Sequence, residues 1–316
     1  MLEIYNDDCI TSKNKLQDRS VDLIICDPPF GLGESQFDKH YSRNINKVIK
    51  GYTEAPQDYA AWTLSWLSEA KRVLKDNGSM YVVMGHTNLR QLLNAAHNLE
   101  LYEKNHLIWK YNFGVNTSKK FVTSHYHVLY YTKNKKNKPT FNTYCRFGAQ
   151  EKNADGGSAL YQDLEDVFNI NREYAPNQYK NQNKLPEALI SKLIQYSSNA
   201  DDTVCDFFMG NFTTAYVAHK LGRHVKGYEI NKIAYDYHMA ELQKLTFASS
   251  LQTLKKIPAD NHVNRGLKLS TQEKTNIRND FAALVAQGHT KKDANILLQD
   301  KYGRGKFAIQ NIIKNI

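Results

Sequence analysis

Two segments of the sequence place an aspartate directly after a short apolar run. Asp27 follows Val21–Cys26, and Asp206 follows Thr203–Cys205. Such runs are typical of buried strands, and open α/β sheets bind ligands beyond the carboxyl ends of their strands. The two carboxylates therefore predict a ligand-binding crevice at one edge of a sheet. The alternative is a pair of aspartates that only cap helices.

The residues after Asp27 could bind an amine on a flat base. Pro28 and Pro29 restrict the backbone and have no N–H, while the Pro28 carbonyl can still accept a hydrogen bond. Phe30 adds an aromatic face on which a base can stack. A carboxylate and a carbonyl together can accept both hydrogens of an exocyclic amine. The alternative is a turn that only ends a strand.

The loop after Asp206 favours a nucleoside ligand. Residues 207–214 read FFMGNFTT and precede a predicted helix, a common arrangement for small-ligand loops. The loop lacks the GxxxxGK[ST] pattern that binds triphosphates. Glu229 ends the next predicted strand, where an acid can bind ribose hydroxyls. Together these residues predict a nucleoside cofactor without a triphosphate.

A sheet must position these residues, and the sequence alternates strand and helix patterns as far as residue 245. Asn77-Gly78 is expected to end the first long helix. The alternation favours an α/β sheet that is covered on both faces. Residues 133–184 break it, and we predict an irregular insertion there. Strands are expected at 2–5, 21–26, 79–84, 107–109, 127–131, 203–205 and 225–228, and helices at 58–75, 89–101, 186–196, 213–221 and 233–245.

The last part of the chain is predicted to be a separate helical unit. Residues 251–270 are expected to be a linker, followed by helices at 272–287, 291–299 and 306–316. The last two helices resemble a helix-turn-helix, in which Ala294, Leu297 and Leu298 would face Ile309, Ile312 and Ile313. Lys306, Gln310 and Lys314 would then be free to bind DNA. A helical cap or a dimerisation element is the alternative.

The composition argues against a membrane protein, a secreted protein and a protein held by metal ions or disulfides. The chain has 316 residues, of which 41% are apolar, and no apolar run approaches the roughly 18 residues of a membrane span. The N-terminus lacks the basic start and apolar stretch of a signal peptide. The cysteines, Cys9, Cys26, Cys145 and Cys205, form no CxxC pair, and the histidines form no obvious metal set. We therefore expect a cytoplasmic protein without a membrane span, a metal site or disulfides.

The charge distribution indicates a polyanionic partner. The net charge is +10. Residues 251–316 hold 12 basic and 5 acidic residues, which gives +7. Residues 133–184 hold 9 and 6, which gives +3, and the remainder is neutral with 21 of each. Two basic segments on a neutral body fit nucleic acid most simply, although a solubilising tail would show the same excess.

These motifs together resemble the DNA amino-methyltransferases that use S-adenosylmethionine, over about residues 1–245. The order matches the beta arrangement of that family, in which the catalytic motif precedes the cofactor motif. "VDLIICDPPFG" resembles the catalytic motif, and "DFFMGNFTTAYVAHKLGRHVKGYEIN" resembles the cofactor motif with its acid. "WLSEAKRVLKDNGSMYV" and "FVTSHYHVLYYTK" resemble segments between them. The resemblance implies a Rossmann-like methyltransferase fold with a mostly parallel twisted sheet.

The resemblance also implies roles for single residues. The catalytic motif falls on Asp27, Pro28, Pro29 and Phe30. The cofactor residues implied are Asp8 and Cys9 beside the adenine, Asp27, the loop residues Asp206, Phe207, Phe208, Gly210, Asn211, Thr213 and Thr214, and Glu229 on the ribose. Residues 133–184 fall on the variable target-recognition region, and residues 1–250 on the catalytic domain.

The cofactor loop departs from the family pattern Asp-Pro-Phe-x-Gly-Ser-Gly-Thr-Thr. Phe207 replaces proline, Asn211 replaces serine, and Phe212 replaces the second glycine. A left-handed backbone is costly for phenylalanine, so we expect this loop to have a different shape. The family's Lys-Pro appears one residue out of step, as Lys184-Leu185-Pro186.

The function predicted from these patterns is methylation of the exocyclic amine of adenine in double-stranded DNA, with the base flipped out of the helix. Methylation of the cytosine amine is the nearest alternative, but cytosine enzymes of the family more often carry serine where Asp27 stands. A regulator that binds DNA without catalysis is an alternative from another class. A homodimer and a partner restriction endonuclease both stay open.

Overall fold

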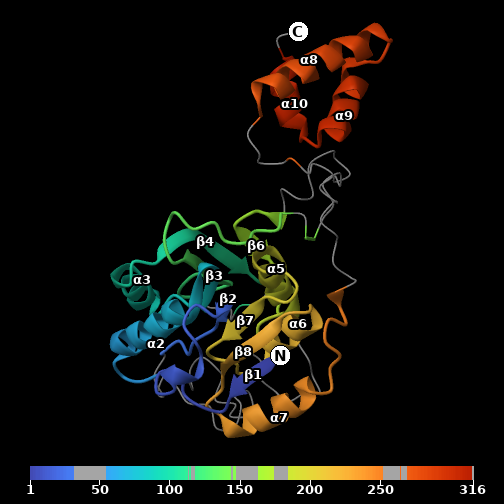
Figure 1. Cartoon of the computed structure of the whole chain (residues 1–316). Coiled ribbons are helices and arrows are strands. Elements are labelled where there is room, and N and C mark those ends of the chain that lie inside the picture. Colours follow the sequence, from blue (N-terminus) through green and yellow to red (C-terminus); the bar gives the residue numbers. More distant parts are fainter. Residues whose placement is uncertain are drawn as a thin grey trace. The chain divides into compact units, whose positions relative to one another are not determined.

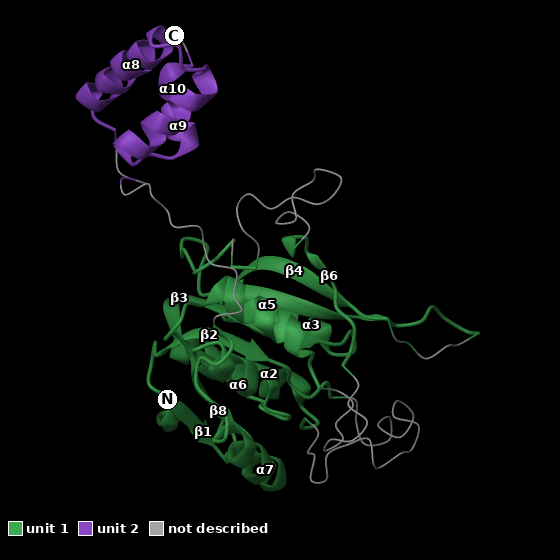
Figure 2. Cartoon of the chain, turned by 90° about the vertical axis from the view of Figure 1, so that its right-hand side faces the viewer, with its two compact units in different colours: residues 1–256 green, residues 257–316 purple. Residues whose placement is uncertain are grey.

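The structure is a computed structural model that describes residues 1–31, 55–112, 114, 118–143, 145–146, 163–173, 184–251, 264 and 269–314. The chain divides into two compact units, residues 1–256 and residues 257–316, which Figure 2 colours separately. Much of the predicted target-recognition region (133–184) and of the predicted linker (251–270) lies outside the described residues.

The first unit is built on one eight-stranded sheet with the strand order β1-β8-β7-β2-β3-β5-β4-β6. Neighbouring strands are parallel except that β5 runs antiparallel to both β3 and β4. The strands are β1 (Leu2–Tyr5), β2 (Val21–Cys26), β3 (Leu74–Met84), β4 (Tyr102–Lys110), β5 (His125–Thr132), β6 (Val167–Asn169), β7 (Thr203–Asp206) and β8 (His224–Tyr228). The α/β prediction is confirmed.

Helices cover both faces of this sheet. Their bounds are α2 (Tyr59–Val73), α3 (Leu89–Asn98), α5 (Glu187–Ser197), α6 (Thr213–Lys220) and α7 (Lys232–Leu242), with a short 3₁₀ turn at Lys13–Lys15. Side chains of β2 alternate between the faces. Leu23 and Ile25 pack in the core with α5, α6 and α7, whereas Ile24 and Cys26 pack in the core with α2 and α3. Figure 1 shows α2 and α3 on the opposite side of the strands from α5 and α6.

The sheet corrects two of the predicted elements. Asn77 and Gly78 do not end the helix but lie within β3, which begins at Leu74, directly after α2. The pairing of β2 with β3 shifts register at this point, so the two residues occupy an irregularity in the sheet. The strand β6 lies in the segment predicted to be irregular, where it pairs with β4.

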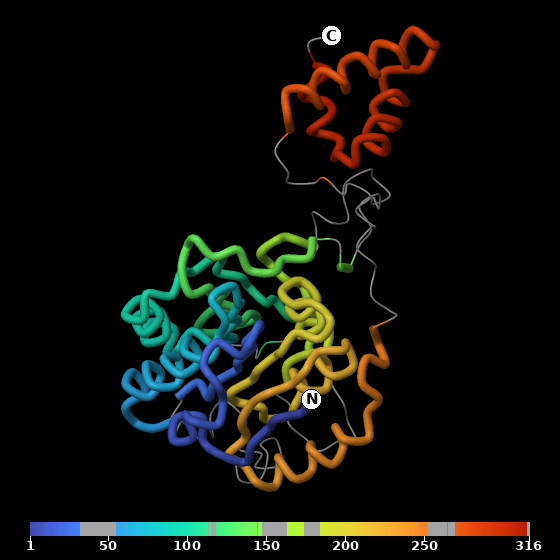
Figure 3. Tube along the Cα trace, in the orientation of Figure 1, coloured from blue at the N-terminus to red at the C-terminus, as the bar shows by residue number. Residues whose placement is uncertain are grey.

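The order of strands brings distant parts of the sequence together. β1 pairs with β8 over its whole length, from Leu2 opposite Val225 to Tyr5 opposite Tyr228. Figure 3 shows this neighbourhood, with the blue start of the chain beside the orange segment of β8. The parallel strands β1, β8, β7 and β2 therefore end at one edge, where their loops carry the predicted site residues.

The second unit contains three helices, α8 (Thr271–Ala286), α9 (Lys291–Tyr302) and α10 (Lys306–Ile313). Its core contains Ala294, Leu298, Ile309 and Ile312, as predicted, and Ile313 packs at its border. Leu297 was predicted to join this core, but its side chain is 43% exposed. It falls outside the buried stripe, which follows the spacing from residue 294 to residue 298. None of the helices in the described ranges combines the length and apolar character that a membrane span requires.

Candidate active site

Four carboxylates follow four adjacent strands at the edge described above. Asp8 follows β1, Glu229 follows β8, Asp206 ends β7 and Asp27 follows β2. The strand register aligns the carboxyl ends of these strands, because Asp206 lies opposite Gly227 and Ile24 lies opposite Cys205. A side chain at position 227 is excluded, because a Cβ there would lie 2.1 Å from the Asp206 carbonyl oxygen. The close approach of β7 and β8 thus depends on this glycine.

Side chains from other elements hold the turn that is predicted to be catalytic, residues 27–31, which we call the catalytic turn. The Tyr59 hydroxyl donates a hydrogen bond to the Pro29 carbonyl (3.0 Å), and the Asn88 amide donates to the carbonyls of Phe30 (2.7 Å) and Gly31 (3.2 Å). Gly31 has φ of 65°, and a Cβ there would lie 2.4 Å from the Tyr59 ring. The turn therefore requires glycine at this position.

The Pro28 carbonyl differs from its neighbours. Within the described residues, no hydrogen bond to it occurs, although the next three carbonyls of the turn all accept one. Pro28 is buried and Asp27 is half-buried. A buried carbonyl of this kind can accept a hydrogen bond from a ligand, because water does not compete for it as it does at the surface.

The pKa values of Asp27 and Asp206 are raised to near neutral pH. Burial and the neighbouring Asp206 carboxylate raise the pKa of Asp27 to about 8, while Arg172 acts in the opposite direction. Burial also raises the pKa of Asp206 to about 7, and hydrogen bonds from the Phe208 N–H and the Thr214 hydroxyl oppose this rise. A cation bound between these groups would favour their ionised forms. The edge is therefore suited to a positively charged ligand.

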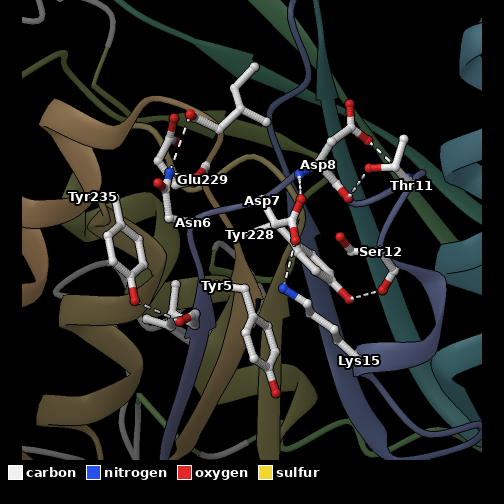
Figure 4. A network of polar contacts seen from close by, with 12 residues as sticks. Tyr5, Asn6, Asp7, Asp8, Thr11, Ser12, Lys15, Tyr228, Glu229 and Tyr235 are labelled. Atoms are coloured by element: carbon white, nitrogen blue, oxygen red, sulfur yellow. Dashed lines mark hydrogen bonds and ion pairs between the residues drawn. The ribbon is translucent and has the colours of Figure 1, made fainter.

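Glu229 fastens the loop that is predicted to bind the cofactor, residues 206–212, to the end of β8; we call this segment the cofactor loop. Its carboxylate accepts hydrogen bonds from the Gly210 N–H (2.7 Å) and from the Asn231 N–H (2.7 Å). Burial raises the pKa of this carboxyl group. The Asn6 amide donates to the Glu229 carbonyl (2.8 Å), which ties the loop after β1 to the same position (Figure 4). Glu229 thus organises both loops that flank the predicted ribose position.

The predicted adenine contacts, Asp8 and Cys9, lie in a tight turn after β1. One Asp8 carboxylate oxygen accepts hydrogen bonds from the N–H groups of Ile10 (2.6 Å) and Thr11 (3.3 Å). Figure 4 shows Asp8 beside Thr11 at the start of this turn. Cys9 is 4% exposed, and burial raises the pKa of its thiol. Cys9 therefore packs in the core as a neutral side chain.

The cofactor loop contains three aromatic residues, and they pack differently. Phe207 is buried edge-on against Tyr228, with ring centroids 5.7 Å apart. Phe208 is half-buried and packs against Trp62 and Trp66 of α2, at 5.6 Å and 5.3 Å. These contacts attach the loop to both α2 and β8.

The expectation of a different loop shape assumed that Phe212 would avoid a left-handed backbone, and this assumption is wrong. Phe212 adopts the left-handed conformation that glycine favours (φ 56°, ψ 22°) and serves as the N-cap of α6. Its ring is fully buried and stacks on His238 of α7 at 5.2 Å. Such a conformation costs a side-chain residue about 1–2 kcal/mol, and burial of a phenylalanine ring contributes about as much or more.

The remaining predicted loop residues lie at the start of α6. Thr213 and Thr214 form its first turn and are 5% and 2% exposed. Asn211 is half-buried in the loop before them.

The predicted DNA-binding residues, Lys306, Gln310 and Lys314, lie in the second unit, where all three are exposed. Within the described ranges, no three histidine, cysteine, aspartate or glutamate side chains group as metal ligands.

Sequence reasoning missed an aromatic cluster beside the catalytic turn. The Arg172 guanidinium stacks on the rings of Tyr111 (4.3 Å) and Tyr126 (5.3 Å) and donates to the Tyr126 hydroxyl (2.9 Å). The Tyr126 ring lies edge-on to Phe30, with centroids 5.3 Å apart. Trp109 packs against both tyrosines. The cluster thus gives Phe30 a rigid aromatic neighbour and places a cation close enough to act on Asp27.

Comparison with known proteins agrees with this geometry. Residues 21–240 match the DNA methylase family of the N6/N4 type. The chain is 28% identical over 309 residues to the type II methyltransferase M.HpaI of Haemophilus parainfluenzae, covering 90% of each chain. It is 30% identical over 260 residues to the DNA adenine methyltransferase YhdJ of Escherichia coli, covering 78% of this chain and 83% of YhdJ.

A solved structure shares the fold. The crystal structure of the M1.HpyAVI–SAM complex superposes with a TM-score of 0.53 at 22% identity, covering 78% of this chain and 100% of that one. The family match spans the catalytic turn, the cofactor loop and Glu229, which are the parts of the molecule that form the edge described above. The chain therefore belongs to the N6/N4 family of DNA methylases, and it is a DNA methyltransferase.

Proposed function

We propose that this DNA methyltransferase transfers a methyl group from S-adenosylmethionine to the exocyclic amine of adenine. The observation that carries the proposal is the pairing of Asp27 with the Pro28 carbonyl, to which no described residue donates a hydrogen bond. These two acceptors match the two hydrogens of an amine. Asp27 stands where cytosine enzymes of the family more often have serine, which favours adenine.

The residues of the catalytic turn activate the amine by positioning it. The lone pair of the amine is delocalised into the base, and two hydrogen bonds to Asp27 and Pro28 favour the tetrahedral nitrogen that can form a new bond. Because Tyr59 and Asn88 hold the turn that carries both acceptors before the base arrives, the catalysis is mainly orientation and electrostatics. The positive charge of the cofactor would favour the ionised form of Asp27, and in that form Asp27 can also take up the proton that the amine loses.

The aromatic cluster fits a base that has left the duplex. Extrusion of the base costs a few kcal/mol, and stacking on Phe30 could return roughly 1–3 kcal/mol. The edge-on contact with Tyr126 fixes the Phe30 ring, so less order is lost when a base binds.

The carboxylate edge fits S-adenosylmethionine, which supplies a methyl group activated by a positively charged sulfur. Glu229 lies where the ribose is expected, at the end of β8, and each of its oxygens keeps a further lone pair for a hydroxyl. Asp206 and Asp27 offer negative charge that a cation would stabilise. Asp8, Cys9, Phe207, Phe208, Gly210, Asn211, Thr213 and Thr214 would complete the cofactor site.

Residues 133–184 are proposed to recognise the target sequence. Their net charge of +3 suits a phosphate backbone. Arg146 and Asp163, which flank residues 147–162, form an ion pair (2.9 Å), and Asp163 also accepts a hydrogen bond from Tyr196 of α5 (2.5 Å). Both flanking residues are therefore linked to α5 of the first unit.

Methyl transfer to DNA tests the proposal directly. The purified chain is incubated with labelled S-adenosylmethionine and genomic DNA of varied origin, and the nucleosides are identified by digestion and mass spectrometry. Methylated adenine supports the proposal. Methylated cytosine alone would contradict the proposal and would instead indicate methylation of the cytosine amine, the N4 activity in the family's name. No transfer to any DNA would favour a regulator that binds DNA without catalysis.

A further inference from the structure

The second unit contains a helix-turn-helix whose last helix exposes an unusual set of side chains. α9 ends at Gly303, which takes the left-handed conformation with φ of 56°. Arg304, 5% exposed, fixes the turn through two 2.9 Å contacts to the Glu273 carboxylate. α10 begins at Lys306, so three residues join the helices, as is typical of this motif.

One side of α10 is committed to the core, and the other is available to a partner. Ile309 and Ile312 are buried at 0% and 6% exposure. The opposite side forms a continuous exposed stripe, which we call the α10 outer face, and consists of Lys306, Phe307, Gln310, Asn311 and Lys314. At 100° per residue these five positions span less than half the circumference of a helix.

The chemistry of the α10 outer face fits DNA. Lys306 and Lys314 carry positive charge, and α10 contains no acidic residue. Gln310 and Asn311 have side-chain amides of the kind that bind adenine edges with two hydrogen bonds. Phe307 is 78% exposed, which is costly in water, but an apolar side chain at this position could contact a thymine methyl group.

The position of these residues also fits the docking mode of the motif. The N-terminal part of a recognition helix contacts base edges; Phe307 lies in the first turn of α10, and Gln310 follows three residues later on the same side. The preceding helix usually touches the DNA backbone. Lys291 and Lys292 are exposed in the first turn of α9, where the helix dipole also favours a phosphate.

We propose that α10 is a base-reading helix that enters the major groove of DNA, with Phe307 and Asn311 reading bases beside Gln310. Lys291, Lys292, Lys306 and Lys314 bind phosphates. This inference rests on the proposed function, because it makes the substrate DNA the partner of the second unit. It adds a second DNA-binding element to that of the catalytic unit.

Binding of the full-length chain to DNA tests the inference. Phe307→Ala and Lys306→Ala are compared with Leu297→Ala, which removes an exposed apolar side chain from α9 instead. The dissociation constant is measured by fluorescence anisotropy over a range of salt concentrations. Phe307→Ala should weaken binding roughly tenfold without a change in the salt dependence, because it removes a contact to bases. Lys306→Ala should reduce the log–log salt slope by about 0.9.

The outcomes separate the inference from its alternatives. Leu297→Ala should bind like the unmodified chain, and circular dichroism should show that all three variants are folded. Unchanged affinity and salt slope in both the Phe307 and the Lys306 variants would overturn the inference. A shift of these variants from dimer to monomer, with DNA affinity unchanged, would overturn it in favour of self-association.

The two proposals can fail separately. A chain that binds DNA through α10 but transfers no methyl group would refute only the proposed activity. A chain that methylates DNA while the Phe307 and Lys306 variants bind it normally would refute only the role of α10.

Discussion

The turns that follow β2 and β7 each present an aspartate, yet different parts of the molecule hold them. Side chains of α2 and of the α3 N-cap fix the catalytic turn through its carbonyls, and one carbonyl stays available for a ligand. The cofactor loop is fixed by Glu229 and by its own buried rings. The catalytic turn thus depends on polar side chains of other elements, whereas the cofactor loop depends on buried rings and on the carboxylates of Glu229 and Asp206.

The largest effect should come from the catalytic turn itself. Asp27→Ala should lower turnover by at least about 10²–10³-fold, because it removes a fixed acceptor for the reacting amine. Cofactor binding should weaken far less than turnover, because Asp27 acts mainly on the amine. Methyl-transfer rates and calorimetry with S-adenosylmethionine measure the two effects. A folded variant that cannot bind the cofactor would contradict this assignment. It would show that Asp27 mainly binds the cofactor, as the cofactor loop is proposed to do.

Phe212→Gly tests whether burial holds the cofactor loop. The change relieves about 1–2 kcal/mol of backbone strain but removes a buried ring worth about 3–5 kcal/mol. The free energy of unfolding should therefore fall by about 2–3 kcal/mol, measured by denaturant titration. Phe212→Leu is the matched control, because it keeps the strain and most of the burial. A stabilised glycine variant would show that backbone shape, not burial, decides this position.

Glu229→Ala tests the carboxylate that holds the loop. Binding of the cofactor should weaken by about 1–3 kcal/mol, the scale of lost charge-assisted hydrogen bonds. The KM for S-adenosylmethionine should rise while the methylated base stays the same. Asp236→Ala, a change at an exposed acid of α7 paired with Lys232, is the control for loss of one negative charge. Equal KM values for the two variants would remove Glu229 from the ribose site.

The smallest effect should be a dependence of stability on pH. The pKa values of Asp27 and Asp206 are raised to about 8 and about 7, so folding favours their protonated forms. This contribution is complete below about pH 4 and is lost as the pH rises through 7 and 8. The Tm of the unliganded chain should therefore fall between pH 6 and 8.5, by about 2–4 °C for each 1 kcal/mol of stability lost.

Ligand and variant controls sharpen the pH experiment. S-adenosylmethionine should raise the Tm more at pH 8.5 than at pH 6, because its positive charge stabilises the ionised carboxylates. Asp206→Asn should flatten the pH profile without ligand. A profile that is flat in the unmodified chain would show that the two aspartates ionise normally.

Local patterns were enough to predict the strand ends and the residues that follow them. A β-branched run before an aspartate predicts a strand whose carboxyl end presents a carboxylate, and the structure has Asp27 and Asp206 in these places. The same patterns failed at Asn77-Gly78, since a turn signal can be accommodated within a strand at an irregularity. The prediction for Phe212 failed for a related reason, because burial of its ring offsets the cost of its left-handed backbone.

The aromatic cluster could not be predicted, because it depends on long-range pairing. Arg172 comes just after β6, a three-residue strand without a periodic signal, and reaches Tyr111 and Tyr126 only because β6 adds to β4. Tyr59 and Asn88 likewise approach the catalytic turn from about 30 and 58 residues away. A local motif predicts the residues of the site, but the residues that support the site come from distant parts of the sequence and are determined by the topology of the fold.

The pairing of β1 with β8 also constrains how the chain is made. Residues 2–5 leave the ribosome well before their partner strand, which comes more than 200 residues later. Closing so long a loop is slow compared with forming the local helices. The growing chain must therefore carry its first strand unpaired until β8 emerges. Because Asn6 and Glu229 meet only then, a nascent chain should gain the ability to bind its cofactor only after β8 has been synthesised.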